Sequence, residues 1–308
     1  MMSHDVLSRL AKLTPEKREC FERLVARRSA SPVAAEAPEP LEFGDPRSPA
    51  ELRAVTQRLY DTASRQLDST PVGRYACFMN LGYVPDGSPE YSVVRLPERL
   101  LGKNAVRLVL ELIGDCPIDG LNILDVGCGR GAVVFVAEEY FKPRSFVGAD
   151  LSFGPIAYCQ RTHKYANVSF VQADAEQLPF RSGYFDVVTN LESSNHYLDV
   201  EAFYKEVFRL LKPGGKFLYS DCMPADFSAR WFVWLRATGL QVEVDRDITH
   251  NVLLACDESS PARFQAFGGD RNRFEVVGEF LSMPGSQVYR DMQSGVLSYR
   301  ILRLSKPK

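Results

Sequence analysis

One stretch, from Asn122 to Ala132, restricts the fold of this chain more than any other part of its sequence. It reads Asn-Ile-Leu-Asp-Val-Gly-Cys-Gly-Arg-Gly-Ala, and its first half is the short apolar run of a buried strand. Three glycines follow, and residues 133–140 have the apolar period of a helix. Glycine accepts a positive φ and has no Cβ, so such a loop can approach a ligand closely. The stretch predicts a strand, a ligand-binding turn and a helix whose N-terminal amides face the ligand.

Two further apolar segments end in the sequence Ala-Asp. Residues 144–150 end at Asp150, and residues 167–174 end at Asp174. In nucleotide-binding βαβ units, a carboxylate at about the distance of Asp150 from the glycine turn binds ribose hydroxyls. The glycine spacing alone would also fit a nicotinamide dinucleotide, which is a weak signal by itself. The ordered acids strengthen the prediction of a nucleoside ligand.

Taken in order, these motifs resemble those of class I S-adenosylmethionine-dependent methyltransferases. The similarity covers about residues 120–221 and includes the later segments 185–190 and 208–219. It implies a Rossmann-like α/β fold, in which helices cover both faces of a seven-stranded, mostly parallel sheet. In addition, we expect a helical lid before the glycine motif and a helical insertion before the last strand.

The resemblance also implies which residues bind the cofactor, S-adenosyl-L-methionine. In the family, the glycine motif and its acidic residue lie against the cofactor, the acid ending the second strand meets the ribose, and the pair after the third strand meets the adenine. The positions that match here are Asp125, Gly127, Gly129, Gly131, Asp150, Leu151, Asp174, Ala175 and Leu191.

The segment from Asn190 to Tyr197 supplies the candidate catalytic residues, because ligands of parallel sheets bind beyond the carboxyl ends of the strands. His196 is the candidate general base, since a neutral imidazole can take a proton from a hydroxyl acceptor near pH 7. Glu192 would fix its tautomer, and Tyr197 would line the acceptor pocket. Many small-molecule methyltransferases have a Glu-x-x-x-His-aromatic run at this place, and Glu192, His196 and Tyr197 resemble it. Related lipid and polyketide enzymes have the histidine one residue earlier, where this chain has Asn195.

Composition and charge bear on the expected substrate class, location and metal content of the chain. The net charge of −2 gives no overall basic field, so nucleic acid is disfavoured as a substrate. Seven cysteines without a C-x-x-C pair favour a reducing, cytoplasmic location and argue against a metal site. The first twenty residues are too charged for a membrane span or an apolar signal core.

The chain before the glycine motif divides into three expected segments. Residues 1–28 form two short amphipathic helices that either dock to a partner or pack on the catalytic domain; together with the linker, they resemble linker helices of polyketide and nonribosomal peptide synthetases. Residues 29–50 are a Pro/Ala-rich linker. Residues 51–118 form the helical lid, with a helix at 95–113 and with Tyr83 as an aromatic contact for the sulfonium.

The methyltransferase core is expected at 119–308. It includes a helical insertion at about 250–284 and a final strand at 295–304. An insertion at this place would lie above the same edge of the sheet and could cover the acceptor. His250, at its start, is a second-rank candidate for the base or for contact with the substrate.

These residues predict an O-methyltransferase that modifies a hydroxyl or enol of a polyketide or hybrid peptide–polyketide. The aromatic-rich lid favours a mostly apolar acceptor, either a free small molecule or a chain tethered to a carrier protein, with synthase modules as possible partners. One alternative is C-methylation of a sterol-like or isoprenoid acceptor, using carboxylates and aromatic rings around a developing cation. The other is a docking protein that has the fold without the catalysis.

Overall fold

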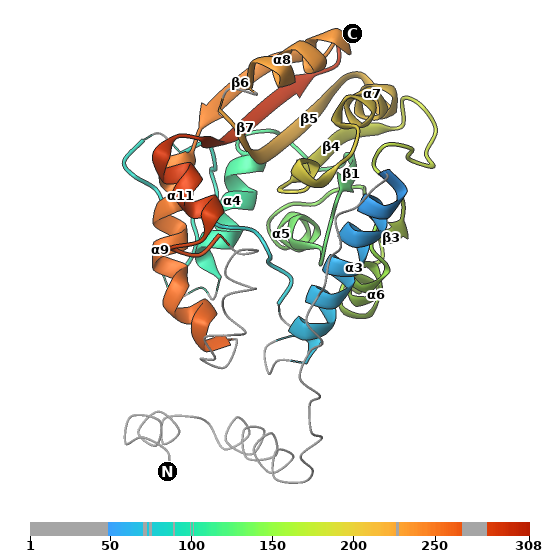
Figure 1. Cartoon of the computed structure of the whole chain (residues 1–308). Helices are drawn as coiled ribbons and strands as arrows, with labels where there is room; N and C mark the ends of the chain where they lie inside the picture. The colour runs from blue at the N-terminus through green and yellow to red at the C-terminus, as the bar shows by residue number, and fades with distance from the viewer. Residues whose placement is uncertain are drawn as a thin grey trace, which may run out of the picture. The chain divides into compact units, whose positions relative to one another are not determined.

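A seven-stranded sheet, ordered β3-β2-β1-β4-β5-β7-β6, is the framework of the described chain (Figure 1). Strands β1 to β5 pair in parallel, and β7 is antiparallel to both β5 and β6. The predicted seven-stranded, mostly parallel sheet is therefore confirmed. The strands are β1 Asn122–Val126, β2 Ser145–Asp150, β3 Val168–Gln172, β4 Phe185–Leu191, β5 Leu211–Pro224, β6 Gln241–Asp247 and β7 Leu297–Ser305.

This computed structural model describes residues 49–69, 73, 76–88, 90–98, 100, 102–225, 228–266 and 282–308. They fall within one compact unit, Pro46–Lys308. The helices predicted at 1–28 and nearly all of the linker predicted at 29–50 lie outside the described residues. In the described part, no helix is both long enough and apolar enough to cross a membrane.

Two hydrophobic cores lie on opposite faces of the sheet because successive strand residues point to opposite sides. Ile123 of β1 packs into one core and Leu124 into the other. The first core holds α4 and α5, and the second holds α7 and α8. The helices are α3 Pro49–Asp68, α4 Lys103–Ile113, α5 Ala132–Tyr140, α6 Phe153–Thr162, η2 Ser194–His196, α7 Val200–Leu210, α8 Ser228–Ala237, α9 Thr249–Ala266 and α11 Gln287–Ser294.

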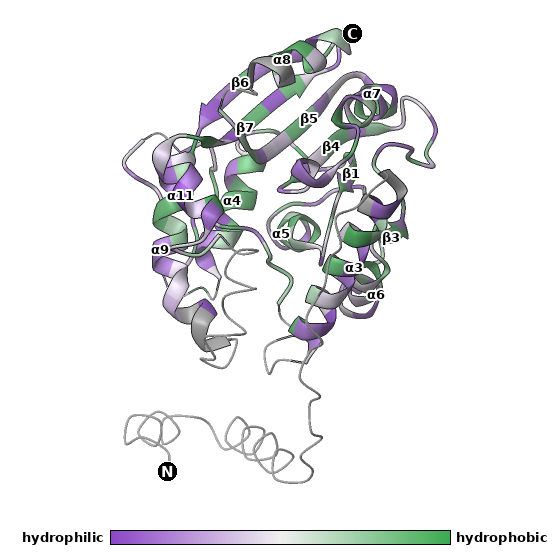
Figure 2. Cartoon of the chain, in the orientation of Figure 1, coloured by the Kyte–Doolittle hydropathy of each residue, from purple (hydrophilic) through white to green (hydrophobic). Residues whose placement is uncertain are grey.

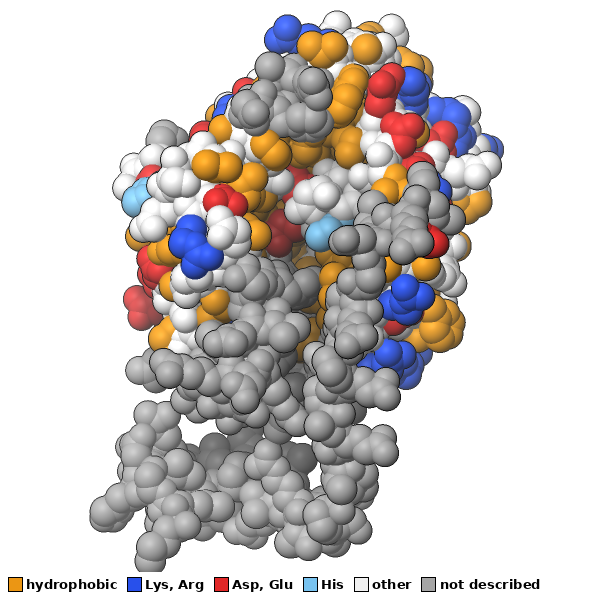
Figure 3. All heavy atoms as spheres, in the orientation of Figure 1, with side chains coloured by type: hydrophobic (Ala, Val, Ile, Leu, Met, Phe, Trp, Pro, Cys, Tyr) orange, Lys and Arg blue, Asp and Glu red, His pale blue; other side chains and the backbone are white. Residues whose placement is uncertain are grey.

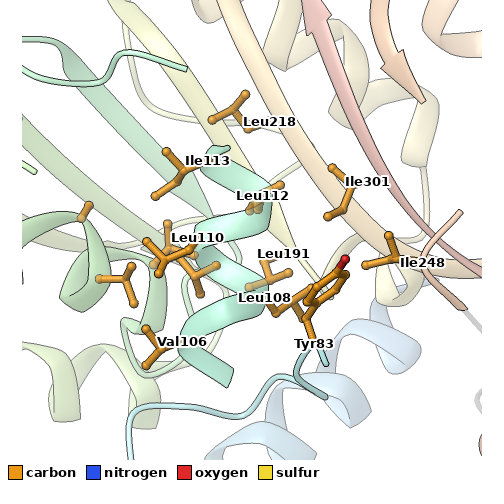
Figure 4. Packing of buried hydrophobic residues seen from close by; sticks show 14 of the residues in the cluster. Tyr83, Val106, Leu108, Leu110, Leu112, Ile113, Leu191, Leu218, Ile248 and Ile301 are labelled. Carbon is orange, nitrogen blue, oxygen red and sulfur yellow. The ribbon is translucent and has the colours of Figure 1, made fainter. Parts of the chain in front are cut away.

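Helix α4 differs from its prediction in length and in role. It begins at Lys103 rather than at residue 95, after Gly102 with a φ of +70°. Pro97 disfavours a helical conformation at the residue before it, and the left-handed backbone of Gly102 interrupts the helical path directly before Lys103. Figure 2 shows α4 as mostly hydrophobic, and Figure 4 shows its leucines inside the first core. The predicted lid at 51–118 therefore includes a core helix.

The predicted insertion before the last strand is helical where it is described. Helix α9 begins it, residues 267–281 lie outside the described part, and α11 follows before β7. Both helices contact β7 and each other at the end of the sheet away from β3 (Figure 1). The insertion thus packs on β7, which lies next to β5, at the other end of the sheet from β3.

Candidate active site

A pocket of about 270 Å³ lies beyond the carboxyl ends of β1, β2 and β4, with residues of α3 in its wall. Ligands of open parallel sheets bind at this edge. Figure 3 shows acidic side chains within a hollow of this face and a histidine at its edge. All of the expected cofactor-binding residues except Gly131 line the pocket.

The glycine loop after β1 has the backbone that only glycine adopts easily. Gly127, Gly129 and Gly131 have φ angles of +70°, +50° and +80°. A Cβ on Gly127 would lie 1.9 Å from Ser193 Oγ, so the space there admits main chain only. Gly131 precedes α5 and faces His163 rather than the pocket, which explains its absence from the lining.

Asp150 stands at the end of β2 with its carboxylate already oriented. Its Oδ2 accepts a hydrogen bond from Gly129 N at 2.8 Å, and its Oδ1 accepts one from Ser152 N at 2.8 Å. Burial raises the pKa of this carboxyl, while the two amide hydrogen bonds oppose the rise. The carboxylate therefore bridges the glycine loop and the turn after β2, where a ribose would lie.

Asp174 and Ala175 follow β3 on the same edge of the sheet. Asp174 Oδ1 accepts a hydrogen bond from Glu176 N at 2.9 Å, and its Oδ2 lies 3.2 Å from Arg53 Nε of α3. Ala175 is buried. This turn forms the far end of the cofactor side of the pocket, beneath the beginning of α3.

Asp125 lies deeper, within β1. Its Oδ1 accepts a hydrogen bond from Thr189 Oγ1 at 2.7 Å, and burial raises its pKa to about 8. A carboxyl with such a pKa is mainly protonated at neutral pH in the free protein. It forms the floor of the pocket next to the glycine loop.

His196 ends the short helix η2, at the rim of the pocket. Its imidazole is exposed on one side and packs edge-on against Tyr60 of α3, with ring centroids 5.6 Å apart. Partial desolvation lowers its pKa below the ordinary 6.5. The imidazole is therefore neutral near pH 7 and can accept a proton.

The turn carrying His196 is held by Asp221, a buried residue of β5. The Asp221 carboxylate accepts hydrogen bonds from Ser194 Oγ at 2.6 Å and from Asn195 N at 3.0 Å. Ser194 Oγ also lies 2.6 Å from Tyr219 Oη. Asp221 is not among the predicted site residues, although an acid near the end of a strand is the same signal that Asp150 gives.

Glu192 does not contact His196 as predicted. Its φ of +51° turns the chain away from a helical path immediately after β4. Its Oε1 instead accepts hydrogen bonds from Leu81 N at 2.9 Å and from the Tyr299 hydroxyl. The predicted i, i+4 pairing required a turn or short helix over residues 192–196, so the left-handed backbone at Glu192 removes it. Burial raises the pKa of Glu192 to about 7.

Tyr197 lines the pocket as predicted, but its hydroxyl faces the glycine loop. It contacts Asn190 Nδ2 at 3.0 Å and Ser193 Oγ at 2.9 Å, and its ring packs on Phe203. A Cβ on Gly127 would lie 2.8 Å from this hydroxyl. Tyr197 thus supports the loop between cofactor and acceptor sides.

Tyr83 and His250 lie away from the pocket, which corrects both predictions. Tyr83 is fully buried in the first core, where Figure 4 shows its ring beside Leu108 and Leu191. Its backbone N donates a hydrogen bond to Asn104 O, which fixes it against the start of α4. His250 is exposed in the first turn of α9. The tyrosines that do line the pocket are Tyr60, Tyr197 and Tyr299.

The pocket suits a cationic nucleoside. The main chain of Gly127 and Gly129 lines the pocket, and Asp150 and Asp174 line the same edge of it. Burial raises the pKa of the Tyr60 hydroxyl, and the negative charges of Asp150, Asp221 and Glu192 raise it further, so these carboxylates lie near Tyr60. An aromatic ring among carboxylates is a favourable environment for a sulfonium. Among the described residues, no group of three or more His, Cys, Asp or Glu is placed to hold a metal ion.

Comparison with known proteins agrees with this geometry. Residues 124–219 match a family described as a methyltransferase domain. A fatty-acid O-methyltransferase of Mycolicibacterium smegmatis is 30% identical over 251 residues, which are 81% of this chain and 89% of that protein. A phthiotriol/phenolphthiotriol dimycocerosates methyltransferase of Mycobacterium tuberculosis is 35% identical over 191 residues, 61% of this chain and 71% of that protein.

The fold is also found in solved structures. The phosphoethanolamine N-methyltransferase 2 of Haemonchus contortus, in complex with S-adenosyl-L-methionine, has a TM-score of 0.61 and 19% identity, covering 83% of this chain and 60% of that chain. At 19% identity, this structural similarity shows a shared fold only. S-adenosyl-L-methionine is the cofactor of this family. The glycine loop, Asp150 and Asp174 line the pocket in which it would bind. The chain belongs to the class I S-adenosylmethionine-dependent methyltransferases.

Proposed function

We propose that this enzyme methylates a hydroxyl or enol oxygen of a lipid-like or polyketide-like molecule, with His196 as the general base. The observation that carries the proposal is a neutral imidazole at the rim of the pocket that the glycine loop and Asp150 also line. The relatives named for fatty acids and phthiotriols support a largely apolar acceptor. The proposal covers a free acceptor and one tethered to a carrier protein of a synthase.

The residues divide the work of catalysis by position. When bound, the cofactor supplies a methyl group on a sulfonium, and the neutral thioether of S-adenosylhomocysteine is the leaving group. The glycine loop, Asp150 and Asp174 hold its nucleoside, so that the methyl group has a defined direction. Tyr60 covers the site and limits access of water to it. His196 takes the proton of the acceptor hydroxyl as that oxygen attacks, and alignment of the two partners contributes much of the rate.

The acceptor side is the half of the pocket near β5 and β7. Apolar side chains line it, with a polar pair formed by Glu192 and Tyr299 at its inner end. The cofactor residues stand over β1, β2 and β3, on the other half of the same sheet edge. This division suits an acceptor with a hydrocarbon body. The apolar residues of that half are Leu81, Cys222 and Val288.

Glu192 favours one alternative, C-methylation through a developing cation. Its carboxyl is partly buried beside Tyr299 and can lose its proton near pH 7, so it could stabilise positive charge on a carbon acceptor. In that reaction His196 would have little effect. The docking-protein alternative requires that the chain does not bind the cofactor, which calorimetry with S-adenosylhomocysteine tests directly.

The test compares variants on extracts of hydroxylated lipids and polyketide intermediates, with a labelled methyl donor and mass spectrometry. We expect His196→Ala to lower kcat by about 10²–10⁴-fold, as loss of a general base does. His250→Ala is the matched control, because His250 is exposed and outside the pocket. If His196→Ala kept its turnover and Glu192→Gln lost it, the carbon acceptor would replace the oxygen acceptor.

A further inference from the structure

Side chains from both ends and the middle of helix α3 make hydrogen bonds or ion pairs with residues around the cofactor side of the pocket. In its middle, Gln57 Nε2 donates a hydrogen bond to Leu151 O at 2.9 Å. One turn later, Asp61 Oδ1 accepts one from Gly154 N at 2.7 Å. Its two ends are attached in different ways. Partly exposed ion pairs of Arg53 attach the N-terminal end, and the buried Arg130 attaches the C-terminal end.

At the N-terminal end, Arg53 binds two carboxylates. Its Nε lies 3.2 Å from Asp174 Oδ2, and its Nη2 contacts Glu176 Oε2. The side chains of Arg53 and Asp174 are 38% and 34% exposed, whereas that of Glu176 is 11% exposed. Asp174 is the acid expected to meet the adenine. The guanidinium therefore orients this carboxylate from above.

Glu176 extends the connection to the catalytic loop. Its Oε1 accepts hydrogen bonds from Leu198 N at 2.9 Å and from Asp199 N at 3.0 Å. These amides come directly after Tyr197, at the end of the segment that carries His196. One carboxylate thus joins α3, the adenine turn and the loop of the candidate base.

At the C-terminal end, α3 is attached by Arg130 of the glycine loop. This arginine is fully buried, and its guanidinium lies 3.4 Å from the centre of the Tyr158 ring. A buried, fully bonded cation is costly to release, whereas a partly exposed ion pair opens easily. The groups that accept its hydrogen bonds, at 2.7 to 3.1 Å, are Ser64 O and Oγ, Asp68 Oδ1, Gly73 O and Ala76 O.

We propose that Arg53 is a positioning residue for the cofactor: its ion pairs with Asp174 and Glu176 hold the first turns of α3 over the adenosine and fix the loop of His196 at the same time. Release of the nucleoside then requires opening at Arg53, while Arg130 keeps the other end of α3 in place. The first part of this inference concerns the cofactor alone. The second part rests on the function proposed for His196.

The experiment measures dissociation of S-adenosylhomocysteine from the full-length chain by surface plasmon resonance. We expect Arg53→Ala to raise the dissociation rate about fivefold, the upper range for partly exposed ion pairs. Raising the salt to ~0.5 M should accelerate release from the wild type and leave Arg53→Ala nearly unchanged, because the screened interaction is already absent. Arg58→Ala is the matched control, since Arg58 is exposed on the same helix.

Two conservative variants separate charge from geometry. Arg53→Lys keeps the charge but lacks the planar fork that reaches two carboxylates, so we expect an intermediate rate. Glu176→Gln keeps an oxygen for the amides of Leu198 and Asp199 and loses the ion pair, and should also be intermediate. Hydrogen exchange should rise in the N-terminal half of α3 in Arg53→Ala and stay low near Ser64.

Other results would overturn the inference. If Arg53→Ala released the nucleoside at the rate and salt dependence of Arg58→Ala, the ion pairs would have no role in holding the cofactor. Equal loss of protection along all of α3 would mean that Arg53 supports the fold instead. If the wild type did not bind S-adenosylhomocysteine at all, the proposed function would fail before this inference was reached.

Discussion

The imidazole of His196 owes its protonation state to its surroundings, because desolvation places its pKa below 6.5. A base must be neutral to act, so activity is lost as the pH falls through this pKa. We therefore expect the acid limb of kcat/KM to have its midpoint below pH 6.5, measured by initial rates at several pH values. A midpoint near 7 would instead match Glu192, whose pKa is about 7.

Asp221 tests whether the turn carrying His196 must be held in place. Asp221→Asn removes the negative charge that accepts from Ser194 Oγ and Asn195 N. We expect kcat to fall roughly tenfold, since hydrogen bonds to charged groups are worth about 1.5–3 kcal/mol. Affinity for S-adenosylhomocysteine should change little, because no residue of the glycine loop bonds to Asp221. A parallel loss of affinity, measured by calorimetry, would indicate general damage to the pocket.

The same residues show where inference from sequence succeeds at this scale. Asp150 lines the pocket with its carboxylate bonded to the glycine loop, as its place at a strand end predicts. Glu192 was assigned a partner from its spacing to His196, yet a single left-handed residue turned it toward Tyr299. Spacing gives a neighbour only when the intervening backbone is regular.

In the glycine loop, the cost of a left-handed backbone can be tested separately from the lack of space for a side chain. Gly127 and Gly183 both have positive φ angles, +70° and +63°, but only Gly127 has atoms near its missing Cβ. Gly183→Ala should cost only the strain of the left-handed backbone, about 1–2 kcal/mol. Gly127→Ala should in addition displace Ser193 and abolish measurable binding of S-adenosylhomocysteine.

Calorimetry and thermal unfolding of both variants would check this expectation. Similar cofactor affinities for Gly127→Ala and Gly183→Ala would show that the loop has room for a side chain, against the 1.9 Å separation from Ser193 Oγ. A larger loss of stability in Gly183→Ala than in Gly127→Ala would likewise contradict the assignment.

At the scale of the whole molecule, three buried acids make stability depend on pH. Burial raises the pKa of Asp125 to about 8, of Glu192 to about 7 and of Asp221 to about 6. An acid with a raised folded pKa keeps a proton that the unfolded chain has lost. Stability therefore falls as the pH rises from the unfolded pKa to the folded one, by up to ~1.4 kcal/mol per pH unit for each acid.

Urea unfolding of the ligand-free chain between about pH 5 and about pH 8 would measure this slope. Asp125→Asn keeps an oxygen for Thr189 and removes one titrating group, so its stability should fall less steeply and exceed that of the wild type at the upper end. An unchanged slope would mean that Asp125 does not carry the proton that its burial predicts.

Elements whose signals are local can be predicted from neighbouring residues. The glycine turn between β1 and α5, the acids at or just after the ends of β2 and β3 and the apolar strands of the sheet all follow from neighbouring residues and their periodicity. Tertiary structure alone decided which distant side chains share the pocket. Tyr60 and Arg53 reach it because α3 packs across the sheet edge, while Tyr83, with an equally suitable ring, is drawn into the core beside α4. Such choices depend on how segments far apart in the chain pack together, and a local pattern carries no information about that.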